Sequence, residues 1–138
     1  MPDKVFFDTN VLVYAHDLES AEKKAKSQGL IFESLRAGRG VISAQVLSEF
    51  FVTITRKVKK PMTVEQARRE IVLLSAMETV DIDATLVVRA VDMKERWKLN
   101  YWDALILGSA ERAGCQTVYS EDLSDGQTYG DVTVRNPY

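Results

Sequence analysis

Four acidic side chains lie at positions that suit a ligand-binding role. Two follow short apolar runs, and two lie within apolar stretches, where carboxylates are uncommon. Asp8 follows the apolar run at residues 5–7, and Asp122 comes shortly after the run at residues 117–119. Glu49 and Asp103 interrupt apolar stretches that have helical spacing. Because an acid in apolar surroundings is costly unless it is paired or bound to a cation, these positions favour carboxylate chemistry.

Each of these acids also has a purely structural interpretation. Asp8 is suited to cap a following helix, and Glu49 could make a capping interaction near the start of its own helix. Asp103 could interact with the dipole of a helix in its first turn, and Asp122 could form a turn. Taken singly, none of the four is specific. Their joint placement, one at each strand end or adjacent helix, favours a shared site.

Convergence of the four carboxylates would create a strong demand for positive charge. Like charges about 4 Å apart repel by about 4 kcal/mol per pair at an effective dielectric constant near 20. Protonation or a bound divalent cation relieves this repulsion, and carboxylate and water oxygens suit Mg²⁺ or Mn²⁺. Such an ion supports phosphodiester hydrolysis, because it lowers the pKa of water and stabilises the leaving oxygen.

The predicted elements would bring these acids to one edge of a sheet. Short apolar runs predict strands at residues 4–7, 40–43, 79–82, 116–119 and 132–134. Longer stretches with helical periodicity lie at residues 11–15, 19–35, 44–54, 63–75, 83–97 and 101–110. This alternation predicts an α/β fold, with a mostly parallel sheet of about 4–5 short strands covered on both faces. In such sheets, ligands bind at the carboxyl ends of the strands.

Length and composition exclude several other classes. A chain of 138 residues predicts a single domain over residues 1–138. With one His and one Cys, a zinc site of the usual composition cannot be built, and every catalytic triad or dyad would have to use His16. The net charge of −2 gives no overall signal for nucleic acid. No apolar run approaches the roughly 18–20 residues of a membrane span, and the lone Cys115 is compatible with a reducing cytoplasm.

Two local sequence patterns each have two interpretations. The basic run Arg56, Lys57, Lys59 and Lys60 is typical of a solvated helix end, but it could also contact the phosphates of RNA. The aromatic pair at residues 101–102 could stack on RNA bases, although its apolar neighbours favour a place in the core or at an interface.

Four segments occur in order along the chain at the predicted strand ends and helix starts. They are Phe7-Asp8-Thr9-Asn10-Val11-Leu12, Ser48-Glu49-Phe50, Tyr101-Trp102-Asp103-Ala104-Leu105-Ile106 and Tyr119-Ser120-Glu121-Asp122-Leu123. Together they resemble the motifs of the PIN-domain nucleases, and particularly the VapC-type ribonuclease toxins of toxin–antitoxin pairs. The resemblance covers essentially the whole chain. The first and third segments together make it specific.

The resemblance implies the PIN fold, a three-layer α/β/α sandwich, and a role for individual residues. The residues that match the metal-binding acidic quartet, which holds Mg²⁺ or Mn²⁺, are Asp8, Glu49, Asp103 and Asp122. Ser120 matches a hydroxyl position that orients the neighbouring acid, and Asn10 is expected to support the ligands from behind. Some members carry a further acid where this chain has Ser124, and we interpret Asp125 as part of a turn. Strand alternation predicts that Glu121 points away from the site.

The function implied is that of a metal-dependent endoribonuclease, acting in the cytoplasm as the toxin of a VapBC-type pair. Its implied partners are an RNA substrate, an antitoxin protein and a second copy of the chain, with no membrane. Water as the nucleophile predicts a 5′-phosphate and a 3′-hydroxyl product. The alternatives are a non-catalytic PIN-like module that binds RNA or a partner, and a housekeeping PIN nuclease without an antitoxin.

Overall fold

The computed structural model describes residues 3–16 and 19–138. Its short strands alternate with helices, as the sequence predicts. The strands are β1 (Val5–Phe7), β2 (Gly40–Ser43), β3 (Glu78–Val80), β4 (Thr117–Tyr119), β5 (Thr128–Tyr129) and β6 (Val132–Arg135). The helices are α1 (Thr9–Tyr14), α2 (Ala21–Ala37), α3 (Ala44–Arg56), α4 (Val64–Leu74), α5 (Ala84–Trp97) and α6 (Tyr101–Arg112).

The described strands form one sheet in the order β3-β2-β1-β4-β6-β5. Every neighbouring pair is parallel except β5 and β6, which are antiparallel. The mostly parallel α/β fold is therefore confirmed, but the sheet has six strands in the described part of the chain instead of four or five. The additional strand is β5. Its two residues lie between Gly126 and Gly130, both with positive φ, so in the sequence the segment is indistinguishable from a turn.

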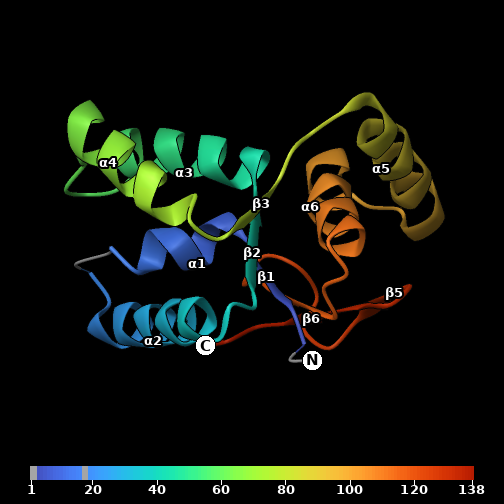
Figure 1. Cartoon of the computed structure of the whole chain (residues 1–138), viewed down its shortest axis with the longest axis horizontal. Helices are drawn as coiled ribbons and strands as arrows, with labels where there is room; N and C mark the ends of the chain where they lie inside the picture. The colour runs from blue at the N-terminus through green and yellow to red at the C-terminus, as the bar shows by residue number, and fades with distance from the viewer. Residues whose placement is uncertain (1–2, 17–18) are drawn as a thin grey trace.

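The helices cover the sheet in two groups. Figure 1 shows α1 to α4 on one side of β1 and β2, and α5 and α6 on the other. Strand β1 lies between β2 and β4, and all three of its residues are buried. A strand enclosed on both faces has to be apolar throughout, which explains the run Val5-Phe6-Phe7. After β1 the chain continues to β2 on one side, and it later returns to the other side of β1 as β4. Where the strand order reverses in this way, a crevice for ligands opens at the carboxyl ends of the strands.

The helices that start beside β1 begin directly where strands end. Asp8 caps α1 immediately after β1, and Ser43, the last residue of β2, caps α3. The Ser43 hydroxyl accepts a hydrogen bond from the Val46 N–H at 3.2 Å, which satisfies a donor that the first helical turn leaves open. The starts of α1 and α3 are therefore fixed at the carboxyl edge of the sheet.

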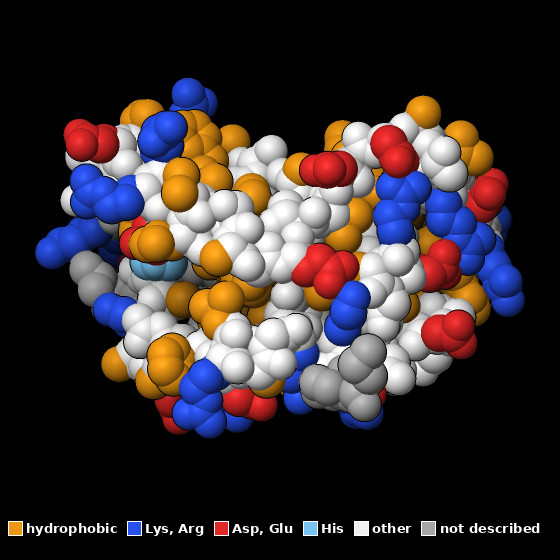
Figure 2. Space-filling model, in the orientation of Figure 1, with side chains coloured by type: hydrophobic (Ala, Val, Ile, Leu, Met, Phe, Trp, Pro, Cys, Tyr) orange, Lys and Arg blue, Asp and Glu red, His pale blue; other side chains and the backbone are white. Residues whose placement is uncertain are grey.

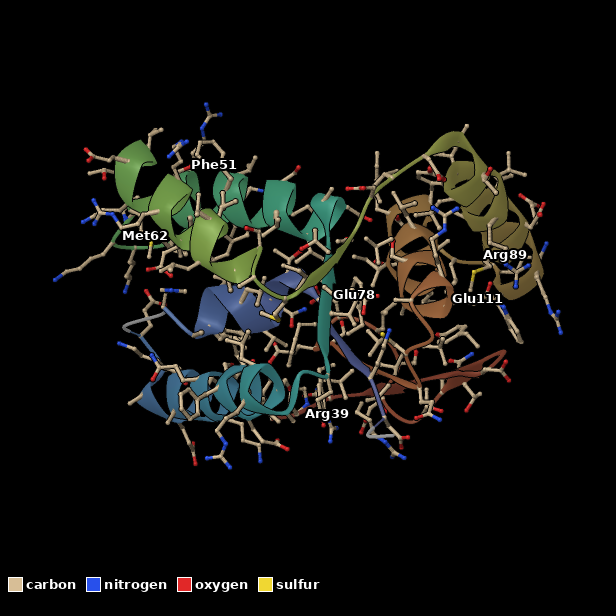
Figure 3. All side chains as sticks on the ribbon, in the orientation of Figure 1. Arg39, Phe51, Met62, Glu78, Arg89 and Glu111 are labelled. Carbon is tan, nitrogen blue, oxygen red and sulfur yellow. The ribbon has the colours of Figure 1, made fainter. Side chains whose placement is uncertain are left out.

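Helix α6 is held firmly against α5. Arg89 of α5 donates two hydrogen bonds to the Glu111 carboxylate of α6, at 2.7 and 2.8 Å, and the two side chains point toward one another in Figure 3. Gly108 of α6 faces Leu86, where a Cβ would lie only 3.4 Å from the leucine Cδ1. This close packing fixes the position of α6, and with it the position of Asp103.

Large apolar side chains also reach the surface. Those on α4 include Val64, Val72 and Leu73, and Figure 2 shows hydrophobic side chains gathered over the part of the molecule that holds α3 and α4. No helix in the described ranges is long and apolar enough to cross a membrane.

Candidate functional site

The register between β1 and β4 places Asp8 next to Ser120. Phe7 pairs with Tyr119, and the Asp8 N–H donates to the Tyr119 carbonyl at 3.0 Å. One residue further on, the Ser120 hydroxyl donates to Asp8 Oδ2 at 2.8 Å. Both side chains are buried, with Asp8 6% exposed. The Ser120 hydroxyl therefore orients the Asp8 carboxylate, and its role beside a metal ligand stays a prediction.

Asp8 has an unusual protonation equilibrium. Its Oδ1 accepts the Thr9 N–H at 2.7 Å, so the carboxyl also caps α1. Burial raises the pKa of Asp8 to about 6, although its hydrogen bonds to Ser120 and Thr9 oppose the shift. The nearby charges of Asp122 and Glu49 raise the pKa further. Capping of α1, the structural interpretation of Asp8, is thus correct, and the same carboxyl also faces two other acids.

Asn10 ties the loop after β4 to the start of α1. Its Nδ2 donates to Asp122 Oδ2 at 3.0 Å, and its Oδ1 accepts the Glu121 N–H at 3.3 Å. The Asp122 N–H donates in turn to the Ser120 hydroxyl at 3.1 Å. The exposed Asp122 carboxylate is therefore held by a side chain far away in the sequence. The role of Asn10 in supporting metal ligands stays a prediction.

Glu49 is held by neutral donors from two helices. Thr9 Oγ1 donates to its Oε2 at 3.2 Å, and Gln45 Nε2 donates to its Oε1 at 2.7 Å. Gln45 lies one helical turn before Glu49, so these side chains are neighbours on one face of α3. Gln45 Nε2 also donates to the Trp102 carbonyl at 3.1 Å. This second contact connects α3 to the start of α6.

Asp103 completes the set from the opposite side of the sheet. It lies half-buried in the first turn of α6. Burial raises its pKa, and the charges of Asp122 and Glu49 raise it further. No hydrogen bond to its carboxylate is found among residues 3–16 and 19–138. The charges of Asp122 and Glu49 thus raise the pKa values of both Asp8 and Asp103. The fold therefore brings all four candidate residues close enough to interact electrostatically.

The donor set suits a hard divalent cation. All four groups are carboxylates, and the charges of Asp122 and Glu49 add to burial in raising the pKa values of Asp8 and Asp103. In the described part of the chain, however, no three His, Cys, Asp or Glu side chains are arranged so that they could hold a metal ion. Three of the four carboxylates instead accept hydrogen bonds from neutral side chains. The pairs are Ser120 to Asp8, Asn10 to Asp122 and Gln45 to Glu49.

Two adjoining hollows open beside Glu49, and Asp122 lines the smaller of them. One, of about 420 Å³, is lined by Asn10, Glu49 and Asp122 from the acidic site. The other, of about 680 Å³, lies between α3 and α6. Glu49, Thr53 and Lys57 line both, so the hollows meet along α3.

Of the basic residues considered as RNA contacts, the structure places only some beside the acids. Lys57 lines both hollows, and Lys59 lines the first and lies 3.4 Å from Glu19. Arg56 and Lys60 are exposed and are not part of either lining. A lysine at this position supplies the positive charge that phosphates need beside a cluster of acids.

A half-buried cluster behind the site was not anticipated. Glu121 accepts hydrogen bonds from Lys23 Nζ and the Tyr14 hydroxyl, both at 2.6 Å. These contacts anchor the loop after β4 to α1 and α2, and they agree with a Glu121 side chain directed away from its neighbour. Asp125 lies in a turn, as predicted, and its carboxylate accepts the Asn136 N–H at 2.8 Å. Of the supporting contacts, only the helical spacing of Gln45 and Glu49 could have been found in the sequence.

Solved structures share this fold over nearly the whole chain. A toxin–antitoxin complex from Klebsiella pneumoniae has a chain that is 21% identical, with 98% of each chain covered and a TM-score of 0.70. DNA-bound VapBC from Salmonella typhimurium matches at 15% identity, covering 99% of this chain and 100% of that chain, with a TM-score of 0.71. A sarcin–ricin-loop-cleaving VapC toxin of Mycobacterium tuberculosis matches at 16% identity, covering 86% and 90%, with a TM-score of 0.63.

At these identities, the structural likeness establishes the fold alone. Comparison with curated protein sequences gives no significant match. The family model of the PIN domain matches residues 5–124, which span all four acidic positions. The match covers most of the sequence, and the chain therefore belongs to the PIN-domain family.

Proposed function

We propose that this PIN-domain protein is a metal-dependent endoribonuclease. Asp8, Glu49, Asp103 and Asp122 would bind Mg²⁺ or Mn²⁺, and the substrate would be cytoplasmic RNA. The observation that carries the proposal is electrostatic: burial raises the pKa values of Asp8 and Asp103, which are far apart in the sequence, and the charges of Asp122 and Glu49 raise both further. Four acids with this mutual influence are tolerable at neutral pH when a cation neutralises them.

The protein's own contribution to the reaction is to orient ligands and to hold the substrate. Ser120 and the N-terminus of α1 fix Asp8, Asn10 fixes Asp122, and Thr9 and Gln45 fix Glu49. Lys57 and Lys59 are positioned to bind phosphates of RNA beside the acids. The chemistry that a bound divalent cation supplies is a lowered pKa for water and stabilisation of the leaving oxygen.

Cleavage of a panel of fluorescent RNAs by the wild type and Asp103→Asn tests the activity. Both proteins are assayed with Mg²⁺, with Mn²⁺ and with EDTA, and Asp125→Asn serves as an acidic control outside the quartet. We expect cleavage by the wild type and the control in either metal, no cleavage in EDTA, and a loss of at least about 100-fold in Asp103→Asn. Equal activity of the wild type and Asp103→Asn would contradict the assignment.

The ends of the RNA products test the nucleophile independently. Attack by water leaves a 5′-phosphate and a 3′-hydroxyl, as the proposal requires. A 2′,3′-cyclic phosphate would show that the ribose 2′-hydroxyl attacks instead, and would eliminate hydrolysis by water. Mass spectrometry of the product ends distinguishes the two.

We further propose that the protein is the toxin of a VapBC-type pair and forms a homodimer. The support is the likeness to chains from toxin–antitoxin complexes of Klebsiella pneumoniae and Salmonella typhimurium. Induced expression should arrest growth, and co-expression of a small DNA-binding protein encoded beside it should restore growth. Cleavage without growth arrest would instead assign a housekeeping nuclease. Metal binding without any cleavage would favour a non-catalytic binding module, and sedimentation velocity measures the dimer.

A further inference from the structure

The larger hollow forms a groove between α3 and α6 that leads away from the acidic site. Its walls include Val52 of α3 and Leu105 of α6, with Ile82 from the segment between β3 and α5. Glu49 lies on the lining shared with the smaller hollow. A ligand bound across the acids would therefore continue directly into this groove.

The groove carries an exposed aromatic ring. Trp102 is 61% exposed, whereas its neighbour Tyr101 is half-buried and packs against the core. The two rings meet edge to face, with centroids 5.1 Å apart. The sequence favoured a place in the core or at an interface for this pair. Tyr101 lies against the core, whereas Trp102 lies outside it. An indole supported on one edge and open to solvent is suited to stack on another planar group.

A buried polar atom beside the groove lacks a hydrogen-bond partner. Gln45 is 9% exposed, and its Oε1 is buried without a hydrogen-bond partner among the residues that the structure describes. Its Nε2 is already used by Glu49 and the Trp102 carbonyl, so Oε1 can only accept a further donor. Lys57 provides a positive charge on the same lining. An apolar peptide side chain would leave both the acceptor and the cation without a partner.

We propose that this groove binds an unpaired nucleobase of RNA next to the phosphate held at the acidic site. The base stacks on Trp102, a neighbouring phosphate contacts Lys57, and an exocyclic amino group of the base donates to Gln45 Oε1. The proposed occupant is single-stranded RNA. We expect a preference for adenine, cytosine or guanine, which carry an exocyclic amino group, over uracil, whose only base donor is the ring N3–H. The proposal rests on RNA being the substrate, but it concerns binding and does not require that the protein cleaves.

Binding of short labelled RNAs to matched variants tests the groove. All variants carry Asp103→Asn, so that no RNA is consumed, and fluorescence anisotropy measures the affinity for unstructured oligoadenylate, oligocytidylate and oligouridylate. Trp102→Ala should weaken binding at least about five-fold, as expected for a lost base stack, while Trp102→Phe keeps most of the affinity. Phe32→Ala removes a similarly exposed aromatic ring of α2 that lines neither hollow, and should have no effect.

A spectroscopic readout shows whether the base lies on the indole. The chain has two tryptophans, so in Trp97→Phe the remaining emission comes from Trp102. Saturation with oligoadenylate should quench this emission. Gln45→Met should bring the affinities for oligoadenylate and oligouridylate closer together, because the acceptor that distinguishes them is gone.

The outcomes separate this proposal from the nuclease activity. Weaker binding by Trp102→Ala, together with quenching, supports the base site even if the wild type cleaves none of the RNAs. Unchanged affinity in Trp102→Ala, or no quenching at saturation, overturns the base site even if the wild type cleaves RNA. A complete lack of RNA binding would also overturn it.

Discussion

The two sides of the acidic site are built differently. On the strand-end side, formed by Asp8, Asn10, Ser120 and Asp122, every side chain takes part in a hydrogen bond to another member. On the groove side, formed by Glu49, Asp103 and Trp102, Asp103 has no hydrogen bond to its carboxylate among the described residues, and Trp102 is largely exposed. The strand-end side is satisfied by its own hydrogen bonds, whereas the groove side borders an open hollow with several apolar walls.

This difference indicates a division of tasks. The strand-end side lies at the carboxyl ends of β1 and β4. There the parallel register holds residues of the two strands at hydrogen-bonding distance from each other. The groove side is carried by α3 and α6, from opposite faces of the sheet. Hydrogen-bonded residues on a rigid sheet give precise placement of ligands, while an open groove between helices can accept a substrate of variable shape.

The largest effect should come from Asp8→Asn on the strand-end side. Because the pKa of Asp8 is raised to about 6, the folded protein holds a proton that the unfolded chain releases from about pH 4, so the free energy of unfolding falls as the pH rises between those values. Asn retains the cap but carries no charge. Urea denaturation in EDTA should show the variant more stable by about 3 kcal/mol at pH 7, with little difference below pH 4.

Asp8→Asn should also abolish cleavage, so that stability and activity change in opposite directions. A destabilised variant at pH 7, or a stability difference that does not vary with pH, would show that the Asp8 carboxyl is not held in the buried environment described above.

Loss of the Ser120 hydroxyl should be the next largest effect. Ser120→Ala leaves the buried Asp8 carboxyl without its 2.8 Å donor, and we expect a loss of about 2 kcal/mol in the free energy of unfolding. The pKa of Asp8 should rise further, because this hydrogen bond lowers it. Ser109→Ala is the matched control: Ser109 is equally buried, but its hydroxyl donates only to a carbonyl of its own helix. Equal losses in both variants would contradict the special role of Ser120.

Metal binding should depend on acids from both sides of the site. If Mg²⁺ is held by acids from both, a tenfold excess over its dissociation constant stabilises the folded wild type by about 1.4 kcal/mol. Neutralising Asp103 on the groove side should remove this gain, although the Asp103 carboxylate accepts no hydrogen bond within the described ranges. The measurement is the melting temperature with Mg²⁺ and with EDTA. An equal gain in the wild type and Asp103→Asn would exclude Asp103 as a ligand.

The smallest effect should come from the cluster behind the strand-end side. Tyr14→Phe removes a 2.6 Å hydrogen bond to the half-buried Glu121, for a loss of about 1 kcal/mol or less in the free energy of unfolding. Lys23 still holds Glu121 at 2.6 Å, so cleavage should change little. A loss of activity as large as that of Asn10→Ala would show that Tyr14 positions Asp122.

Local patterns were sufficient to predict most of the elements. The sequence 63–66 contains a capping box, and the structure has both of its hydrogen bonds, from Gln66 N–H to the Thr63 hydroxyl and from Thr63 N–H to Gln66 Oε1. Gly38 ends α2 with a positive φ, as expected of glycine after a helix. Strand β5 was missed because its two residues have no pattern of their own, and only pairing with β6 makes them a strand.

The sequence by itself determined the alternation of strands and helices, the identity of the four acids and their resemblance to PIN-domain motifs. These features depend on residue types and short spacings, which chain neighbours decide. Only the tertiary structure decided that Ser120 bonds to Asp8, that Lys57 lines the site while Arg56 does not, and that Trp102 is exposed beside a buried glutamine acceptor. The physical reason is that these contacts form across the parallel register of β1 and β4 and across the gap between α3 and α6, where the partners are distant in sequence.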